Sequence, residues 1–209
     1  AQISTNEALR AVYRRPSERV VRKELTALDG HCRGFIAQSP FLLLATVGAD
    51  GRVDVSPRGD TAGFVQVHDD HTVLIPDRPG NNRLDSLTNL VERPGAATIF
   101  MIPGVDETLR INGTIAIHDD LELRERFAVG GRLPTTVLVL EPQQVYLHCA
   151  KAFMRSHLWD PETGPQRVRQ GPDDVRRVVG LDPLEQVDHR LLAHVARDLG
   201  EAHQLAGAA

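Results

Sequence analysis

A run of polar and charged side chains separates two apolar stretches near the middle of the chain. The stretch VLIPDRPGNNRLDSL, residues 73–87, begins as an apolar run that stops at Pro76 and ends with leucines at helical spacing. Between them lie two arginines, two asparagines and a glycine. An arginine presents a rigid fork of N–H donors, and a glycine lets a backbone approach a ligand closely. The run is therefore typical of an anion-binding loop at the start of a helix.

A solvated turn between a strand and a helix is the alternative explanation of the same run. Such a turn requires a glycine or an asparagine, but it does not require this density of forked donors. Nearly all basic residues of the chain are arginines, with lysine only at Lys23 and Lys151. The choice of arginine at one position therefore carries little weight, and the interpretation depends on what other segments contribute.

Composition limits the partners and the compartment. The 209 residues carry a formal net charge of -4, which does not favour a nucleic acid partner. No apolar run approaches the roughly 18 residues of a membrane helix, and the first residues lack the apolar core of a secretory signal. Cys32 and Cys149 lie too far apart to suggest a disulfide framework or a metal site, so both are expected to be buried thiols. The sequence predicts a cytoplasmic protein with no membrane segment.

Short strands dominate the hydrophobic pattern. Seven segments predict strands, at residues 41–48, 52–57, 63–68, 71–76, 96–103, 108–118 and 135–149. Asp50-Gly51 and Asp69-Asp70 are hairpin signals, and Asn112-Gly113 inside a strand predicts a bulge or bend. Strands and helices do not alternate regularly, which argues against a doubly wound sheet. The pattern favours an antiparallel barrel.

Helical periodicity is confined to segments that flank or interrupt the strands. Two N-terminal helical segments are predicted, with Ser17 capping the second and Gly30 ending it, together with helices near 82–92 and 120–129. The tail contains a further amphipathic helix. We expect residues 1–34 to pack on the barrel, residues 35–160 to form it, and residues 161–209 to add a loop and a C-terminal helix to the same domain.

Four segments contain most of the residue types that could bind a ligand. They are DVSPRGD (54–60), IPDRPGNNRLDSL (75–87), ETLRINGTI (107–115) and HCAKAFMRSHLWDP (148–161). In this order they resemble the pyridoxamine 5'-phosphate oxidase-like family of FMN-binding split-barrel proteins, over about residues 35–161. The resemblance implies a mainly β, α+β fold, a six- to seven-stranded antiparallel split β-barrel with flanking helices. It also implies a homodimer that holds FMN at the interface between its subunits.

The resemblance assigns cofactor contacts to each of these segments. The first would pass under the flavin ring toward the phosphate, and the second would hold the phosphate itself. Arg110 would lie near the flavin pyrimidine, where a cation stabilises the anion formed on reduction. Lys151 and Arg155, four residues apart on one helical face, would reach the partner's flavin. The expected cofactor-binding residues are Val55, Ser56, Pro57, Arg58, Ile75, Pro76, Asp77, Arg78, Asn82, Arg83, Arg110, Lys151 and Arg155.

The function implied by the resemblance is that of an FMN-dependent oxidoreductase acting on an unidentified small molecule, with the flavin as the redox group. No residue is assigned as a catalytic acid or base. No metal site is expected, because the run of residues 68–71, HDDH, is typical of a hairpin turn. The alternatives are a non-catalytic carrier or sensor of flavin or haem, and a deazaflavin-dependent reductase. The phosphate segment and the C-terminal stretch differ from those of true pyridoxamine phosphate oxidases, which argues against the vitamin as substrate.

Overall fold

The computed structural model describes residues 2–160 and residue 162. By internal contacts the chain divides into two units, Ala1–Ser156 and His157–Ala209, and every strand and helix of the described residues belongs to the first unit. The helix expected in the tail lies outside the described residues. Its assignment to the same domain as the barrel therefore stays a prediction.

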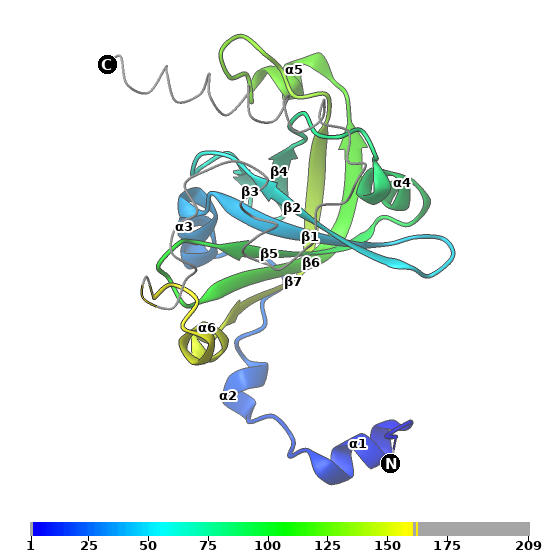
Figure 1. Cartoon of the computed structure of the whole chain (residues 1–209), viewed down its shortest axis with the longest axis vertical. Helices are drawn as coiled ribbons and strands as arrows, with labels where there is room; N and C mark the ends of the chain where they lie inside the picture. Colours follow the sequence, from blue (N-terminus) through cyan, green and yellow to red (C-terminus); the bar gives the residue numbers. More distant parts are fainter. Residues whose placement is uncertain (1, 161, 163–209) are drawn as a thin grey trace, which may run out of the picture. The chain divides into compact units, whose positions relative to one another are not determined.

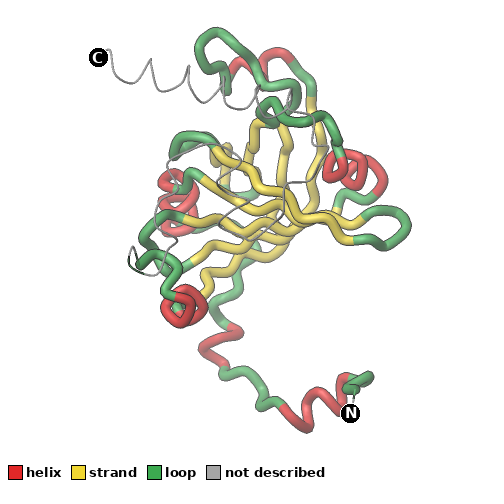
Figure 2. Tube along the Cα trace, in the orientation of Figure 1, coloured by secondary structure: helices red, strands yellow, loops and turns green. Residues whose placement is uncertain are grey.

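Seven antiparallel strands form one sheet in the order β2-β1-β5-β6-β7-β4-β3 (Figure 1). They are β1 (Phe41–Val47), β2 (Val53–Gly59), β3 (Gln66–Asp69), β4 (Thr72–Pro76), β5 (Gly95–Met101), β6 (Thr108–His118) and β7 (Val137–His148). Figure 2 shows them as one continuous sheet. All seven expected strands and both expected hairpins are confirmed, because apolar alternation and turn residues are signals carried by neighbouring positions.

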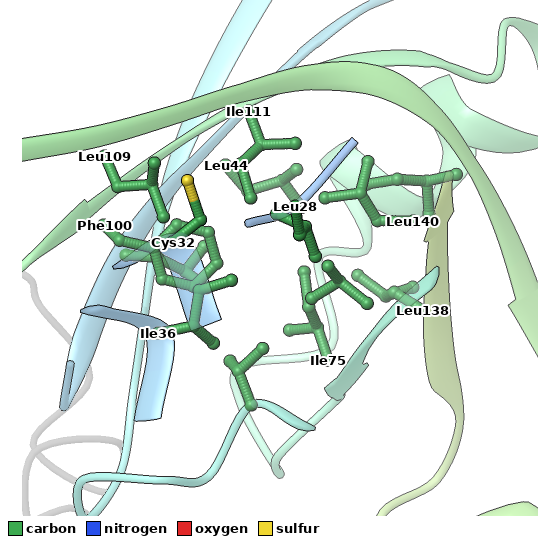
Figure 3. Close-up of a cluster of buried hydrophobic side chains, with 14 of the residues drawn as sticks. Leu28, Cys32, Ile36, Leu44, Ile75, Phe100, Leu109, Ile111, Leu138 and Leu140 are labelled. Carbon is green, nitrogen blue, oxygen red and sulfur yellow. The ribbon is translucent and has the colours of Figure 1, made fainter. Parts of the chain in front are cut away.

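The sheet coils so that one of its faces encloses a single core. Alternation along β1 buries Leu42 and Leu44, and β4, near the other end of the strand order, buries Val73 and Ile75. These side chains belong to the same cluster as residues of β5, β6 and β7 (Figure 3). Because β2 and β3 each have only one neighbouring strand, the sheet remains open. The fold is the expected antiparallel split barrel.

Six helices lie within the described residues. They are α1 (Asn6–Val12), α2 (Glu18–Val21), α3 (Gly30–Gln38), α4 (Asp85–Glu92), α5 (Leu121–Glu125) and α6 (Lys151–Ser156). The prediction that Gly30 ends a helix is wrong, because Gly30 begins α3. Asp29 is the N-cap of α3, and its carboxylate accepts a hydrogen bond of 2.8 Å from the Cys32 N–H. Sequence reasoning missed α3 because two glycines weaken its helical signal.

The two cysteines have different surroundings. Cys32 is buried in the core, and burial, with a further contribution from Asp29, raises the pKa of its thiol to about 11. Cys149 is exposed, so the expectation that both thiols are buried is wrong for this residue. Cys149 follows the last residue of β7, where the strand alternation that buries side chains has ended.

The N-terminal segment is anchored to the barrel at its C-terminal end. The backbone N–H and carbonyl of Leu25 both bond to Val145 of β7, at 2.9 and 2.8 Å, and Leu28 is buried in the core. In contrast, α1 contains no buried residue. The packing of the whole segment 1–34 on the barrel therefore stays a prediction.

A bulge in β6 occurs where the sequence predicts it. The pairing of β6 with β7 shifts register between Asn112 and Gly113. A Cβ atom placed on Gly113 would lie 2.0 Å from the carbonyl oxygen of Glu141. Only glycine therefore allows β7 to approach β6 this closely at the bulge.

We expect Gly113→Ala to lower the free energy of unfolding by about 3 kcal/mol or more, because the clash is with backbone and can be relieved only by separating the strands. Gly34→Ala is the matched control, since a Cβ at Gly34 meets no atom within 4 Å. In helix α3 that change should stabilise by roughly 0.5–1 kcal/mol. Denaturant unfolding of both variants tests this, and equal stabilities would show that the strands do not approach as described.

Candidate functional site

A cavity of about 420 Å³ opens between the end of β2 and the loop that joins β4 to α4. Its volume lies in the range of ligand pockets. Two of the segments singled out in the sequence, 54–60 and 75–87, line it together, although they are not adjacent in the chain. The lining residues are Asp54, Ser56, Pro57, Arg58, Gly59, Phe64 and every residue from 76 to 87.

Strand β2 presents polar side chains to the cavity because of its register with β1. Asp54, Ser56 and Arg58 lie opposite Thr46, Leu44 and Leu42, the buried positions of β1, and are half-buried. The intervening residues of β2 belong to the outer face of the sheet and are exposed. The two-residue period of a strand therefore points three polar side chains toward the inner side at this edge.

Two ion pairs connect β2 to the segment that follows β4. Arg58 donates from Nη1 to a carboxylate oxygen of Asp77. In the reverse direction, Arg78 Nε donates to Asp60 Oδ2 at 2.7 Å, and Arg78 Nη1 donates to the carbonyl oxygen of Phe127 at 2.8 Å. Strands β2 and β4 share no backbone ladder. The reciprocal pairs therefore join two parts of the sheet that hydrogen-bonded pairing leaves apart.

The loop before α4 has an unusual backbone. Asn82 and Leu84 have positive φ angles of 57° and 60°, and Leu84 is the residue before the helix begins. The helix therefore starts at Asp85 and not near Asn82 as expected, because left-handed residues cannot continue a right-handed helix. No side chain caps this helix start, and its first residues line the cavity. Its first backbone N–H groups are thus available to a ligand.

Arg83 lies within this loop and is the most exposed of the three cavity arginines. Its Nε donates to Asp85 Oδ2 at 2.9 Å, and its side chain is 73% exposed. The hydrogen bond to Asp85, together with the charge of that carboxylate, raises the pKa of Arg83 above its usual value. The described contacts of the Arg83 side chain use Nε alone, so its two terminal nitrogens remain available to an anion.

A short chain of hydrogen bonds forms the polar wall of the cavity. Ser86 is 3% exposed. Its hydroxyl donates a hydrogen bond to Asp54 Oδ2 at 2.6 Å and lies 2.9 Å from the Ser56 hydroxyl. Sequence analysis named Ser56 but missed Asp54 and Ser86. The two-residue spacing of Asp54 from Ser56 was a signal for the first, whereas the approach of α4 to β2 has no local signal.

Formal charges in the cavity cancel. Three arginines line it, at positions 58, 78 and 83, and so do three aspartates, at positions 54, 77 and 85. Arg58 Nε is buried and has no hydrogen-bond partner in the described residues. Unused guanidinium donors and an uncapped helix start are the groups that bind phosphate or carboxylate in proteins. The residues present therefore fit an anionic group of phosphate size.

Five of the expected site residues do not line the cavity, and Arg110 is one of them. Ile75 is fully buried in the core, and Val55 lies on the outer face of β2 with 55% of its surface exposed. Lys151 and Arg155 lie on the short helix α6, which follows β7. Strand β7 is four positions from β2 in the sheet, so within one chain the two basic residues belong to a different part of the structure.

Arg110 forms a separate polar group on β6 and β7. Its Nη2 donates to Gln144 Oε1 at 3.2 Å, and its guanidinium carbon lies 5.5 Å from the centre of the Tyr146 ring. His148 packs edge-on against the same ring, with the centroids 4.9 Å apart. Burial, and secondarily the charge of Arg110, lower the pKa of His148. The Nε of Arg110 and the Oδ1 of Asn112 are buried without a partner in the described residues.

No helix among the described residues is long and apolar enough to span a membrane. Within the same residues, no three potential metal ligands of the His, Cys, Asp or Glu type come together.

Comparison with known proteins gives one family match and several distant structural likenesses. Residues 28–149 match the sequence model of the family named pyridoxamine 5'-phosphate oxidase. No curated protein matches the chain. Among solved structures, HupZ of Group A Streptococcus is 16% identical, with a TM-score of 0.47, and the match covers 57% of this chain and 93% of that one.

Two other solved structures give similar values. An FMN-binding protein of Syntrophomonas wolfei is 16% identical over 56% of this chain and 83% of its own, with a TM-score of 0.44. A protein named F420 reductase is 18% identical over 56% of this chain and 97% of its own, with a TM-score of 0.40. Likenesses this distant assign no function.

The family match is of a different kind, because it spans more than half of the chain. It begins at Leu28 in the core, ends just after β7, and contains all seven strands and every residue that lines the cavity. This chain belongs to the pyridoxamine 5'-phosphate oxidase family.

Proposed function

We propose that this protein binds FMN, with the phosphate in the cavity, and that it acts as an FMN-dependent oxidoreductase on a small molecule. The observation that carries the proposal is the convergence of Arg58, Arg78 and Arg83 beside an uncapped helix start. A phosphate monoester carries close to two negative charges near neutral pH. Forked guanidinium groups and backbone N–H groups are its preferred partners.

The outer face of the sheet offers a surface for the rest of the cofactor. Pro57 lines the cavity, and the register of the sheet continues from it through Leu43 and Ile99 to Arg110. These positions lie on neighbouring strands, so Pro57 and Arg110 are separated by three strand spacings, roughly 14 Å in all. The ribityl chain and the ring of FMN can span such a distance. This register supports the expected contact between Arg110 and the flavin pyrimidine.

The residues of the chain would bind, orient and shield the cofactor. When bound, the flavin supplies the redox chemistry. Arg110 would hold its positive charge beside the pyrimidine, where negative charge accumulates on reduction. Leu43 and Ile99 are apolar and half-buried, and would exclude water from one side of the ring. No described residue is assigned as a proton donor or acceptor.

A second copy of the chain would complete the site. Val53 and Val55 on the outer face of β2 are 70% and 55% exposed, so a ring lying across this face would remain open to water in a single chain. Lys151 and Arg155 do not line the cavity of their own chain. A twofold dimer would cover both rings and bring each α6 to the other chain's cofactor. We therefore propose a homodimer with shared sites.

Replacing Arg83 should weaken FMN binding far more than replacing Arg93. Arg83 lines the cavity, whereas Arg93 lies at the other end of α4 and donates from Nη2 to the Ala49 carbonyl at 2.7 Å. A charged hydrogen bond to phosphate contributes about 1.5–3 kcal/mol, so Arg83→Ala should raise the Kd roughly tenfold or more. Quenching of FMN fluorescence measures both variants. Similar losses in the two would show that the phosphate is not bound at this loop.

Mixing two defective chains tests the shared site. Arg83→Ala damages the cavity of its own chain, and Arg155→Ala damages the part supplied to the partner. A heterodimer of the two variants contains one site with both residues intact, so co-refolded mixtures should recover about one tight FMN site per heterodimer. Each homodimer alone serves as the control. If the mixture binds no better than the two homodimers, or if the FMN complex sediments as a monomer, the site is not shared.

A further inference from the structure

We infer that Asp77 acts as a built-in anion of the phosphate site: its carboxylate neutralises Arg58 while the site is empty, and it opposes the phosphate once that group is bound. The inference rests on the proposed phosphate site and names the residue that sets its affinity. It predicts that an acidic side chain in the wall of this cavity weakens the binding of the ligand's phosphate.

The Arg58–Asp77 pair is the most shielded ion pair of the described residues. The two side chains are 18% and 14% exposed, compared with 23% and 26% for Arg78 and Asp60. The backbone N–H of Asp77 donates to the Thr136 carbonyl at 2.9 Å, which fixes this residue just beyond the end of β4. The carboxylate therefore belongs to the shielded part of the cavity wall.

Shielding explains why the empty site needs this carboxylate. An unpaired guanidinium removed from water is strongly unfavourable, whereas a paired one is tolerated. A bound phosphate brings more negative charge than Asp77 and can neutralise Arg58 itself. From that point Asp77 is a like charge beside the phosphate, and like charges repel most where water is excluded. Asp77 therefore stabilises the empty site and reduces the affinity of the filled one.

The contacts of Arg58 distinguish this role from that of a positioning residue. Arg78 is held by the Phe127 carbonyl as well as by Asp60, so one lost contact leaves it in place. Arg58 has Asp77 as its described side-chain partner, and its Nε is buried without one. Without the charge of Asp77, Arg58 can turn all its donors toward a phosphate. If Asp77 served to orient Arg58, removing its charge would have the opposite effect.

The test is the affinity of the full-length Asp77→Asn variant for FMN and for riboflavin, which lacks the phosphate. We expect FMN to bind about tenfold more tightly than to the unmodified protein, because a like charge near the phosphate is removed. Riboflavin should bind equally to both proteins. Asp119→Asn is the matched control, because it removes the same charge from an exposed residue that does not line the cavity. Its affinity for both ligands should be unchanged.

The possible outcomes separate this inference from the proposed function. Equal affinity of the unmodified protein for FMN and riboflavin would overturn both, because the cavity would then not hold a phosphate. If the unmodified protein prefers FMN and Asp77→Asn binds it no more tightly, or less tightly, the inference alone is overturned.

A second pair of variants covers the case in which Asp77→Asn does not fold. Arg58→Ala leaves the carboxylate of Asp77 facing the phosphate, whereas Arg58→Ala combined with Asp77→Ala removes both charges and leaves no unpaired one. The double variant should bind FMN at least about fivefold more tightly than Arg58→Ala. Equal affinities of the single and double variants would overturn the inference.

Discussion

The candidate site depends on two reciprocal ion pairs between the end of β2 and the residues that follow β4, two segments whose strands share no backbone hydrogen bonds. An antiparallel sheet that remains open has nothing in its ladders to hold β2 close to β4. Arg58 and Asp77 supply one connection, and Asp60 and Arg78 supply the other in the reverse direction. Because these links lie where the chain enters the loop before α4, the same four side chains shape the cavity. The contacts that link these two parts of the open sheet are therefore also part of the cavity wall.

This arrangement also determines the electrostatics of the site. A cavity lined by three free arginines would be expensive to keep empty, because partly buried charges lose hydration. Each arginine is instead paired with an aspartate, which stabilises the empty site and still leaves some guanidinium donors unused. The buried Nε of Arg58 and the terminal nitrogens of Arg83 are such donors. The protein thus keeps a stable empty site that can still accept a phosphate.

The backbone conformation of the loop before α4 also shapes the cavity. Left-handed backbone at Asn82 and Leu84 delays the start of α4 until Asp85, so the polar run wraps the cavity before the helix begins. Ser86 in the first turn then reaches Asp54 and Ser56 on β2. These contacts place α4 against the strand that carries Arg58.

Sequence reasoning was most successful where structure is decided by neighbouring residues. The seven strands, the two hairpins and the bulge at Gly113 follow from alternation and turn residues, and all are observed. The two segments that line the cavity, 54–60 and 75–87, were also found from the sequence, because their polar residues are close together in the chain. The pairing of Arg58 with Asp77 was not predicted, because it joins positions that only the coiled sheet brings together. Helix α3 was missed because its two glycines weaken the helical signal, and the late start of α4 was missed because it depends on positive φ angles.

The central claim is that the cavity at the end of β2 holds the phosphate of FMN. Isothermal titration of the apoprotein with FMN, riboflavin and FAD tests it most directly, since the three ligands share a flavin ring and differ in the group at the end of the ribityl chain. We expect FMN to bind at least about tenfold more tightly than riboflavin, because charged hydrogen bonds to phosphate contribute about 1.5–3 kcal/mol. FAD should bind more weakly than FMN, because no second motif for its adenine end was found in the sequence. Equal affinities for FMN and riboflavin would contradict the account.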